Sequence, residues 1–124
     1  FNNGVMKRDF TYIDDIVEGL IRSLDNIPGD QDNLHTATRS PYKIYNIGNN
    51  DPVTLRRFIS AIELACGQKA KEKWLPMQMG DVPITYADVD NFIKDIGFEP
   101  STSIEEGINK FIEWYKQYRK HFEI

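Results

Sequence analysis

The segment Arg8-Asp9-Phe10-Thr11-Tyr12-Ile13-Asp14-Asp15 decides the fold, because it leads from a short extended run directly into a helix. Aromatic and β-branched residues alternate with polar ones up to Ile13, which predicts an extended backbone. From Ile13 onward, apolar residues recur every three or four positions and predict one apolar stripe along an α-helix. The stripe is made of Ile13, Ile16, Val17, Leu20, Ile21 and Leu24.

The charged residues of this segment have two explanations each. Asp14 and Asp15 fall in the first helical turn, where unpaired N–H groups and the helix dipole favour negative charge, so helix capping accounts for them. Arg8 lies just outside the corner between strand and helix, where its planar guanidinium is suited to bind a carboxylate or a phosphate. The alternative for Arg8 is an ordinary salt bridge on the surface.

Length and composition indicate one globular domain over residues 1–124. The chain is 40% hydrophobic and 27% charged, which is an ordinary globular composition. Its net charge of −4 gives no electrostatic footprint for nucleic acid. No apolar run approaches the roughly 20 residues that span a bilayer. We therefore expect no nucleic-acid partner and no membrane partner.

The single cysteine excludes an internal disulfide and favours a reducing compartment, the cytoplasm. Cys66 is expected to be a buried, inert thiol on the apolar face of a helix. His35 stands alone in a polar loop over 26–41, so no metal site is assigned. The start, Phe1-Asn2-Asn3-Gly4, does not resemble a signal peptide. Asn3-Gly4 reads as a hairpin turn after a strand, so we interpret the chain as a fragment of a longer protein.

Three more helices and several short strands are expected downstream. One helix is capped by Thr54 and ends at Gly67, and a short one begins after Asp88 and ends at Gly97. The last helix follows a capping box formed by Ser103 and Glu106. Strands are expected over 42–47 and 70–76, with Trp74 and Leu75 as buried anchors, and the aromatic stripe of the last helix (Phe111, Tyr115 and Tyr118, bordered by Trp114) is expected to be core. The pattern predicts an α/β fold of four helices and several short strands, without a complete Rossmann sheet.

Two motifs resemble the extended short-chain dehydrogenases/reductases, and more narrowly the nucleotide-sugar 4-epimerases that act on UDP-glucuronate and UDP-galacturonate. The first runs from Asn3-Gly4 through Arg8 to Gly19. The second is Gln78-x-Gly80-Asp81-Val82, followed by Thr85-x-Ala87-Asp88. The similarity extends from Asn3 to about Tyr118. It departs from the family at Met79, where uronate epimerases usually have proline.

The resemblance implies a small C-terminal substrate-binding domain and assigns roles to three residues. In the family, an arginine at the place of Arg8 contacts the diphosphate of the UDP-sugar. An aspartate at the place of Asp81 approaches the ribose, whose hydroxyl groups suit a carboxylate acceptor. Gln78 would assist at the uridine end. Galactose-type epimerases carry a second phosphate-binding arginine at this position, so Gln78 favours the uronate branch.

The parent enzyme implied by the resemblance inverts C4 of a UDP-hexuronic acid by transient oxidation with NAD. Such an enzyme needs a glycine-rich turn for the dinucleotide. No two glycines of this chain are close enough to form one. It also needs a Tyr-x-x-x-Lys pair, and none of the six tyrosines is followed four residues later by lysine. We therefore assign no catalytic and no cofactor-binding residue here, and we expect both on an N-terminal Rossmann domain that this chain lacks.

Three alternatives remain open at this point. The first is that the parent enzyme is a dehydratase or a decarboxylating enzyme of the same superfamily that acts on a nucleotide sugar. The residues that would distinguish these enzymes from an epimerase lie outside this chain. The chain alone is a module that binds UDP-sugar weakly. Finally, the chain has no independent activity and self-associates through the exposed face that should dock on the dinucleotide domain.

Overall fold

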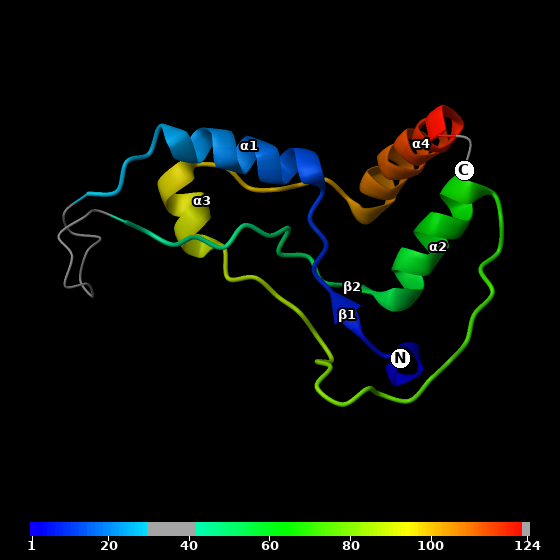
Figure 1. Ribbon diagram of the computed structural model, residues 1–124. Coiled ribbons are helices and arrows are strands. Elements are labelled where there is room, and N and C mark those ends of the chain that lie inside the picture. Colours follow the sequence, from blue (N-terminus) through cyan, green and yellow to red (C-terminus); the bar gives the residue numbers. More distant parts are fainter. Residues whose placement is uncertain (30–41, 123–124) are drawn as a thin grey trace.

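The computed structural model describes residues 1–29 and 42–122 (Figure 1). His35 and most of the loop expected over 26–41 lie outside these residues. The elements follow in the order η1 (Asn2–Gly4, a 3-10 turn), β1 (Lys7–Arg8), α1 (Ile13–Leu24), β2 (Val53–Thr54), α2 (Leu55–Cys66), α3 (Asp90–Ile96) and α4 (Ile104–Phe122). Four helices and a small two-stranded sheet confirm the expected α/β class.

A short ladder around β1 connects distant parts of the chain. β1 pairs antiparallel with β2, with Lys7 opposite Thr54 and Arg8 opposite Val53. On its other side Lys7 bridges in parallel to Ile84: its N–H donates to the Pro83 carbonyl (2.9 Å), and its carbonyl accepts from the Thr85 N–H (3.2 Å). Three segments therefore meet at β1, between the helices α1 and α2 that follow β1 and β2 (Figure 1).

Local signals set both ends of α2, the end of α3 and the start of α4, whereas the N-cap of α3 is Val89 and not Asp88 as expected. The Thr54 hydroxyl accepts from the Arg57 N–H at 3.2 Å and caps α2, and the Ser103 hydroxyl accepts from the Glu106 N–H at 3.2 Å at the start of α4. Gly67 and Gly97 end α2 and α3 with φ of 69° and 68°. Asp14 and Asp15 lie in the first turn of α1, but its N-cap is Tyr12.

Two pairs of helices build the packing, α2 against α4 and α1 against α3. Phe92 of α3 is 1% exposed, and its ring contacts those of Tyr45 and Phe98 edge-on at 5.8 and 6.5 Å between centroids. Gly19 of α1 lies so close that a Cβ added there would meet the Phe92 ring at 2.9 Å. Between the two pairs, Phe10 stacks on Phe58 of α2 at 4.5 Å.

Both predicted strands outside the ladder are wrong as strands in this structure. No strand is assigned to 42–47 or 70–76 in the part of the chain that the structure describes. A strand requires a neighbouring strand, and periodicity alone does not supply one. Trp74 is 45% exposed, held between Arg56, 5.0 Å from its ring centroid, and Gly4, where any side chain would overlap the ring.

Three further expectations are corrected. Asn3-Gly4 belongs to a left-handed 3-10 turn rather than a hairpin, and the Asn3 N–H donates to the Leu75 carbonyl. Cys66, the last residue of α2, is exposed rather than buried. The aromatic residues of α4 are partly exposed rather than core, at 48% for Phe111 and 53% for Trp114. Ile112, the residue after Phe111 along α4, is only 8% exposed, so the packed face of the helix is the one that carries Ile112.

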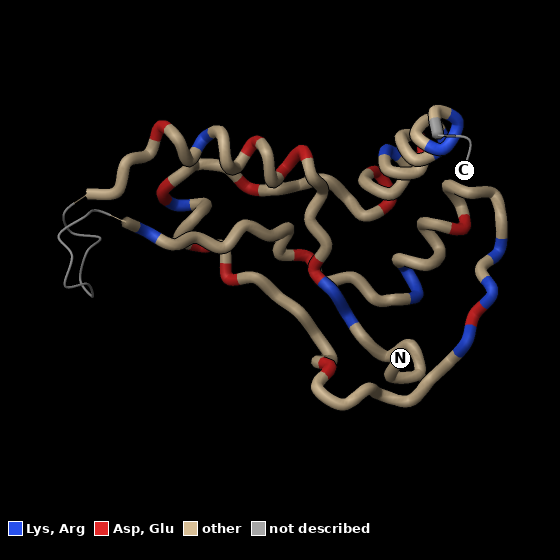
Figure 2. Tube along the Cα trace, in the orientation of Figure 1, with Lys and Arg blue, Asp and Glu red and all other residues tan. Residues whose placement is uncertain are grey.

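No described helix has the length and apolar character needed to cross a membrane. Helix α1 carries three acidic residues followed by one arginine, whereas Lys and Arg are frequent over residues 69–73 and at the end of α4 (Figure 2). Along the described chain, charged residues of both signs therefore occur in most segments.

Asp95 is expected to make the stability of the fold depend on pH. Its carboxylate pairs with Lys43 at 2.6 Å and accepts from the Tyr45 hydroxyl at 2.9 Å. Lys43 first, and then Tyr45, hold the pKa of Asp95 below its ordinary value. Because the folded-state pKa is depressed, this stabilisation is complete above the unfolded pKa of about 4 and is lost as the pH falls through the folded value.

We therefore expect Asp95→Asn to lower the urea midpoint at pH 7, and the gap from the wild type to close as the pH falls from about 5 to 3. Urea unfolding of both proteins at several pH values measures this gap. A gap that stays constant with pH would show that the Asp95 charge contributes nothing.

Candidate functional site

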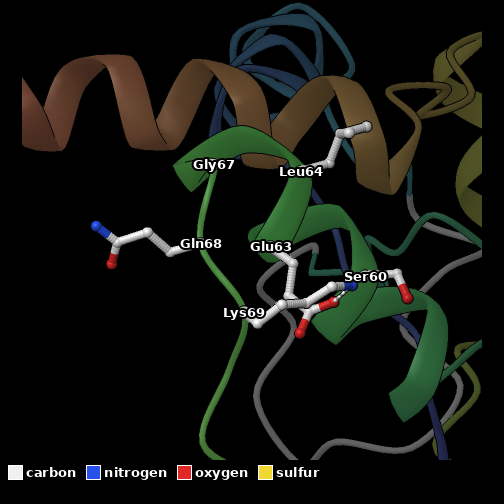
Figure 3. Close-up of a pocket in the computed structure, with 6 residues that line it drawn as sticks. All are labelled: Ser60, Glu63, Leu64, Gly67, Gln68 and Lys69. Atoms are coloured by element: carbon white, nitrogen blue, oxygen red, sulfur yellow. Dashed lines mark hydrogen bonds and ion pairs between the residues drawn. The ribbon is translucent and has the colours of Figure 1, made fainter.

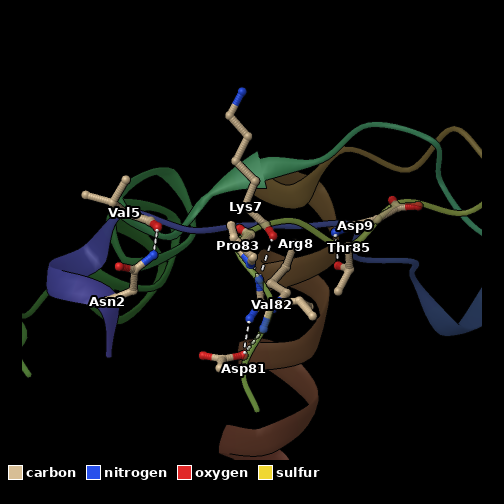
Figure 4. Close-up of polar contacts among 9 residues, drawn as sticks. All are labelled: Asn2, Val5, Lys7, Arg8, Asp9, Asp81, Val82, Pro83 and Thr85. Carbon is tan, nitrogen blue, oxygen red and sulfur yellow. Dashed lines mark hydrogen bonds and ion pairs between the residues drawn. The ribbon is translucent and has the colours of Figure 1, made fainter. Parts of the chain in front are cut away.

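Arg8 is positioned by the central strand of the ladder. Its guanidinium Nη1 donates to the carbonyls of Lys7 (2.9 Å) and Pro83 (3.4 Å), and Nη2 donates to Asp81 Oδ1 at 2.7 Å (Figure 4). The side chains of Arg8 and Asp81 are 24% and 29% exposed. The planar cation is thus fixed in direction by the protein and still reachable from solvent, which suits it to bind an anion.

Asp81 is held by the turn that carries it. Its N–H donates to the Gln78 carbonyl at 3.1 Å, and Gly80 between them has φ of 84°, a conformation that favours glycine. Asp81 Oδ1 also accepts from the Val82 N–H at 3.0 Å. Among the described residues, both hydrogen bonds to this carboxylate reach Oδ1, so Oδ2 is the oxygen that can accept from a ligand hydroxyl.

The structure thus brings together two of the three residues singled out in the sequence, although Arg8 and Asp81 are 73 positions apart. Gln78 lies in the same turn as Asp81 and is exposed. A cation and a carboxylate side by side can bind a ligand that carries both an anion and hydroxyl groups. Asp14 and Asp15 take no part: Asp15 accepts from the Thr102 N–H at 3.0 Å, which ties α1 to the segment before α4.

Asp9 is a site residue whose importance the sequence reasoning missed. Its N–H donates to the Thr85 hydroxyl at 3.1 Å, and its Oδ2 accepts from the Asn50 N–H at 3.2 Å. Its Oδ1 is buried without a hydrogen-bond partner, beside a cavity of about 210 Å³ lined by Thr11, Gly48 and Thr85. Asp9 therefore joins its own segment to those of Asn50 and Thr85. Its place directly after Arg8 in the motif was the one sequence signal that could have identified it.

The hollow of about 290 Å³ at the end of α2 is less suited to binding (Figure 3). Glu63 accepts there from Lys69 Nζ at 2.7 Å and from the Ala70 N–H at 2.8 Å. The bond from Lys69 is the larger cause that lowers the pKa of Glu63, followed by the bond from Ala70. This carboxylate is already occupied in closing the end of α2. No group of three or more His, Cys, Asp or Glu residues in 1–29 and 42–122 could hold a metal ion.

The described glycines do not fit a dinucleotide. Gly4, Gly67, Gly80 and Gly97 have positive φ, but each stands alone at a turn or a helix end. No strand of the described chain leads through a glycine-rich turn into a helix. The described residues therefore contain no glycine-rich turn of the kind that holds a dinucleotide pyrophosphate.

No protein-family model matches the chain. It is 45% identical over 126 residues to "Protein CapI" of Staphylococcus aureus, over 97% of this chain and 38% of that protein. It is 43% identical over 129 residues to a probable UDP-glucuronate 4-epimerase of Rhizobium meliloti, with the same coverage. The chain thus spans about two fifths of the length of these curated relatives.

Solved structures agree with these relatives. The fold matches that of the UDP-glucuronic acid 4-epimerase of Bacillus cereus, solved in complex with UDP-glucuronic acid and NAD. The TM-score is 0.74 and the sequence identity 26%, over 95% of this chain and 34% of that one. Sequence and fold therefore point to the same group of proteins.

Proposed function

This chain is a homologue of part of the UDP-glucuronate 4-epimerases, and on that basis we propose that it is the UDP-sugar-binding part of a nucleotide-sugar 4-epimerase. The enzyme inverts C4 of a UDP-hexuronic acid, interconverting UDP-glucuronate and UDP-galacturonate by transient oxidation with NAD. The observation that supports this best is the Arg8–Asp81 pair, because it offers a fixed cation to a diphosphate and a carboxylate oxygen to a ribose.

Substrate binding and chemistry belong to two different domains in such an enzyme. Residues 1–124 form one C-terminal domain that contributes Arg8, Gln78 and Asp81 to the binding of UDP. The NAD site and the acid/base pair belong to a separate N-terminal Rossmann domain, in line with the isolated glycines of this chain. We place the enzyme in the cytoplasm, since an exposed single cysteine is compatible with a reducing compartment. We also propose that it acts in polysaccharide biosynthesis.

Titration of the chain with UDP, followed by heteronuclear NMR, tests the half-site. We expect shifts that cluster at Arg8, Gln78 and Asp81, and much weaker binding of uridine, which has no diphosphate for Arg8. Charge-assisted hydrogen bonds contribute about 1.5–3 kcal/mol, so uridine should bind roughly 10- to 100-fold less tightly than UDP. Equal affinities for uridine and UDP, or shifts at the end of α2, would exclude this half-site.

The chain by itself is expected to have no epimerase activity, because it carries neither the dinucleotide site nor the Tyr/Lys pair. Incubation of the purified chain with UDP-glucuronate and NAD, followed by chromatography of the sugars, measures this directly. Detectable UDP-galacturonate would refute the assignment of the chemistry to another domain.

A further inference from the structure

Arg8 stands at the end of a very short strand. β1 consists of Lys7 and Arg8, and Arg8 is the last residue that pairs with β2, where it lies opposite Val53. Strands are usually about three to ten residues long, and the ends of an element open most readily. Contacts beyond the ladder are therefore needed if the Arg8 guanidinium is to keep one direction.

Asp9 supplies such contacts on both sides of β1. Its N–H donates to the Thr85 hydroxyl at 3.1 Å, and Thr85 belongs to the segment that bridges to β1 on one side. Its Oδ2 accepts from the Asn50 N–H at 3.2 Å, shortly before β2 begins on the other side. Asp9 thus extends the ladder by one residue beyond Arg8 toward both neighbouring segments.

The side chains of Arg8 and Asp9 serve different directions, as expected for neighbours in an extended chain. Figure 4 shows Arg8 running to Asp81, whereas the carboxylate of Asp9 leaves the strand in another direction. The loop before β2 lies directly against this carboxylate, because a Cβ added at Gly48 would be 3.1 Å from Asp9 Oδ2. Asn50 has a φ of 56°, which is uncommon for residues other than glycine. This loop conformation aims a backbone N–H at Asp9.

The charge of Asp9 is costly at this place. Among the described residues its Oδ1 is buried without a hydrogen-bond partner, which costs stability. A carboxylate next to Arg8 also repels an anion that Arg8 binds. A neutral residue would avoid the repulsion, but a charged acceptor makes hydrogen bonds that are roughly twice as strong as those of a neutral one. The strength of the bond to Asn50 is therefore the advantage that accounts for an aspartate here.

We propose that Asp9 is a positioning residue for the UDP-sugar site, which fixes the end of β1 and thereby holds the Arg8 guanidinium in direction. This inference rests on the proposed function, in which Arg8 binds the diphosphate. Asp9 acts through Arg8 and not by contact with the nucleotide. Its loss should therefore weaken the binding of UDP and leave that of uridine unchanged, because uridine has no diphosphate.

NMR of the nucleotide-free chain tests the proposal through the Nε–Hε signal of Arg8, whose relaxation reports the order of the side chain. In Asp9→Ala we expect this signal to lose its order. We also expect the Lys7 amide, which donates to the Pro83 carbonyl at 2.9 Å, to exchange faster. The increase should be roughly 10- to 100-fold, the equivalent of one charge-assisted hydrogen bond. An Arg8 signal as ordered as in the wild type overturns the proposal, whatever happens to the ladder.

Asp15→Ala is the matched control. Asp15 Oδ2 also accepts one backbone N–H from a distant segment, that of Thr102 at 3.0 Å. Its loss removes a contact of the same kind between α1 and the segment before α4, and should leave the Arg8 signal ordered. Equal loss of order in Asp9→Ala and Asp15→Ala would assign the effect to a general loosening of the fold and overturn the proposal.

Asp9→Asn provides a conservative second variant. It keeps the shape of the side chain and one acceptor oxygen, but its hydrogen bond to Asn50 is neutral and weaker. We expect an Arg8 signal that is more ordered than in Asp9→Ala and less ordered than in the wild type. If Asp9→Ala does not fold, an Arg8 signal in Asp9→Asn that equals the wild type overturns the proposal.

Titrations with UDP and uridine report the proposed function separately. For Asp9→Ala we expect UDP to bind roughly 10-fold less tightly and uridine to bind as before, and no further effect when Arg8→Ala is already present. Equal weakening of UDP and uridine would overturn the positioning role. A wild-type chain that does not bind UDP would contradict the proposed function alone, because the Arg8 signal is measured without nucleotide.

Discussion

Arg8→Ala is expected to weaken the binding of UDP to this chain by roughly 10- to 100-fold, the equivalent of losing one charge-assisted hydrogen-bonded contact. The guanidinium is fixed by Asp81 and by the Lys7 and Pro83 carbonyls, so a diphosphate meets a cation already held in direction. NMR titration measures the dissociation constant even in the millimolar range. Removal of Arg8 also leaves Asp81 without its partner, and its uncompensated charge would repel the diphosphate.

Two variants give this experiment its controls. Arg57 is a matched arginine, since it pairs with Glu105 at 2.8 Å and is 44% exposed, so Arg57→Ala should leave UDP binding unchanged. Arg8→Lys keeps the charge but loses the planar fork, and we expect it to recover only part of the affinity. Equal affinities of the wild type and Arg8→Ala for UDP would show that Arg8 is not part of the binding site.

Phe92→Ala should have the largest effect on stability. The side chain is 1% exposed and contacts Tyr45, Phe98 and the backbone near Gly19, so its removal leaves a cavity between α1 and α3. Truncation of a buried Phe to Ala costs about 3–5 kcal/mol. Small domains have a total stability of about 5–15 kcal/mol, so the variant should be close to unfolding. Urea unfolding followed by circular dichroism measures the change in midpoint.

Phe111→Ala is the matched control for that prediction. Phe111 is 48% exposed on α4, so its truncation should shift the urea midpoint far less than Phe92→Ala does. Similar shifts for the two variants would mean that the core is not centred on α3.

The helices were predictable because their signals are local. The apolar spacing after Ile13, the cap at Thr54 and the stop at Gly97 each act within a few residues, and the structure confirms all three. The strands over 42–47 and 70–76 were not predictable in the same way, since strand formation depends on a pairing partner elsewhere in space. The predicted burial of Cys66 and of the aromatic residues of α4 was wrong for a related reason. Periodicity identifies the apolar face of a helix but does not say what covers it.

The candidate site was only partly accessible to sequence reasoning. Spacing alone cannot join Arg8 to Asp81 across 73 positions, and it was the resemblance of two motifs that selected them. The ion pair between them was not foreseen, nor was the role of Asp9, whose contacts come from the backbone of Asn50 and the hydroxyl of Thr85. Backbone partners leave no signature in residue type. The roles of Arg8, Gln78 and Asp81 toward UDP stay predictions.

The ladder at β1 has a consequence for how the chain folds. It closes a loop of more than 70 residues, and closing long loops costs entropy before any contact compensates for it. The ladder should therefore form late, after the local turns of α2 and α4. A nucleotide bound across Arg8 and Asp81 would hold both ends of that loop together. UDP should thus act as a thermodynamic clamp, raising the melting temperature in proportion to the logarithm of its concentration at saturating levels.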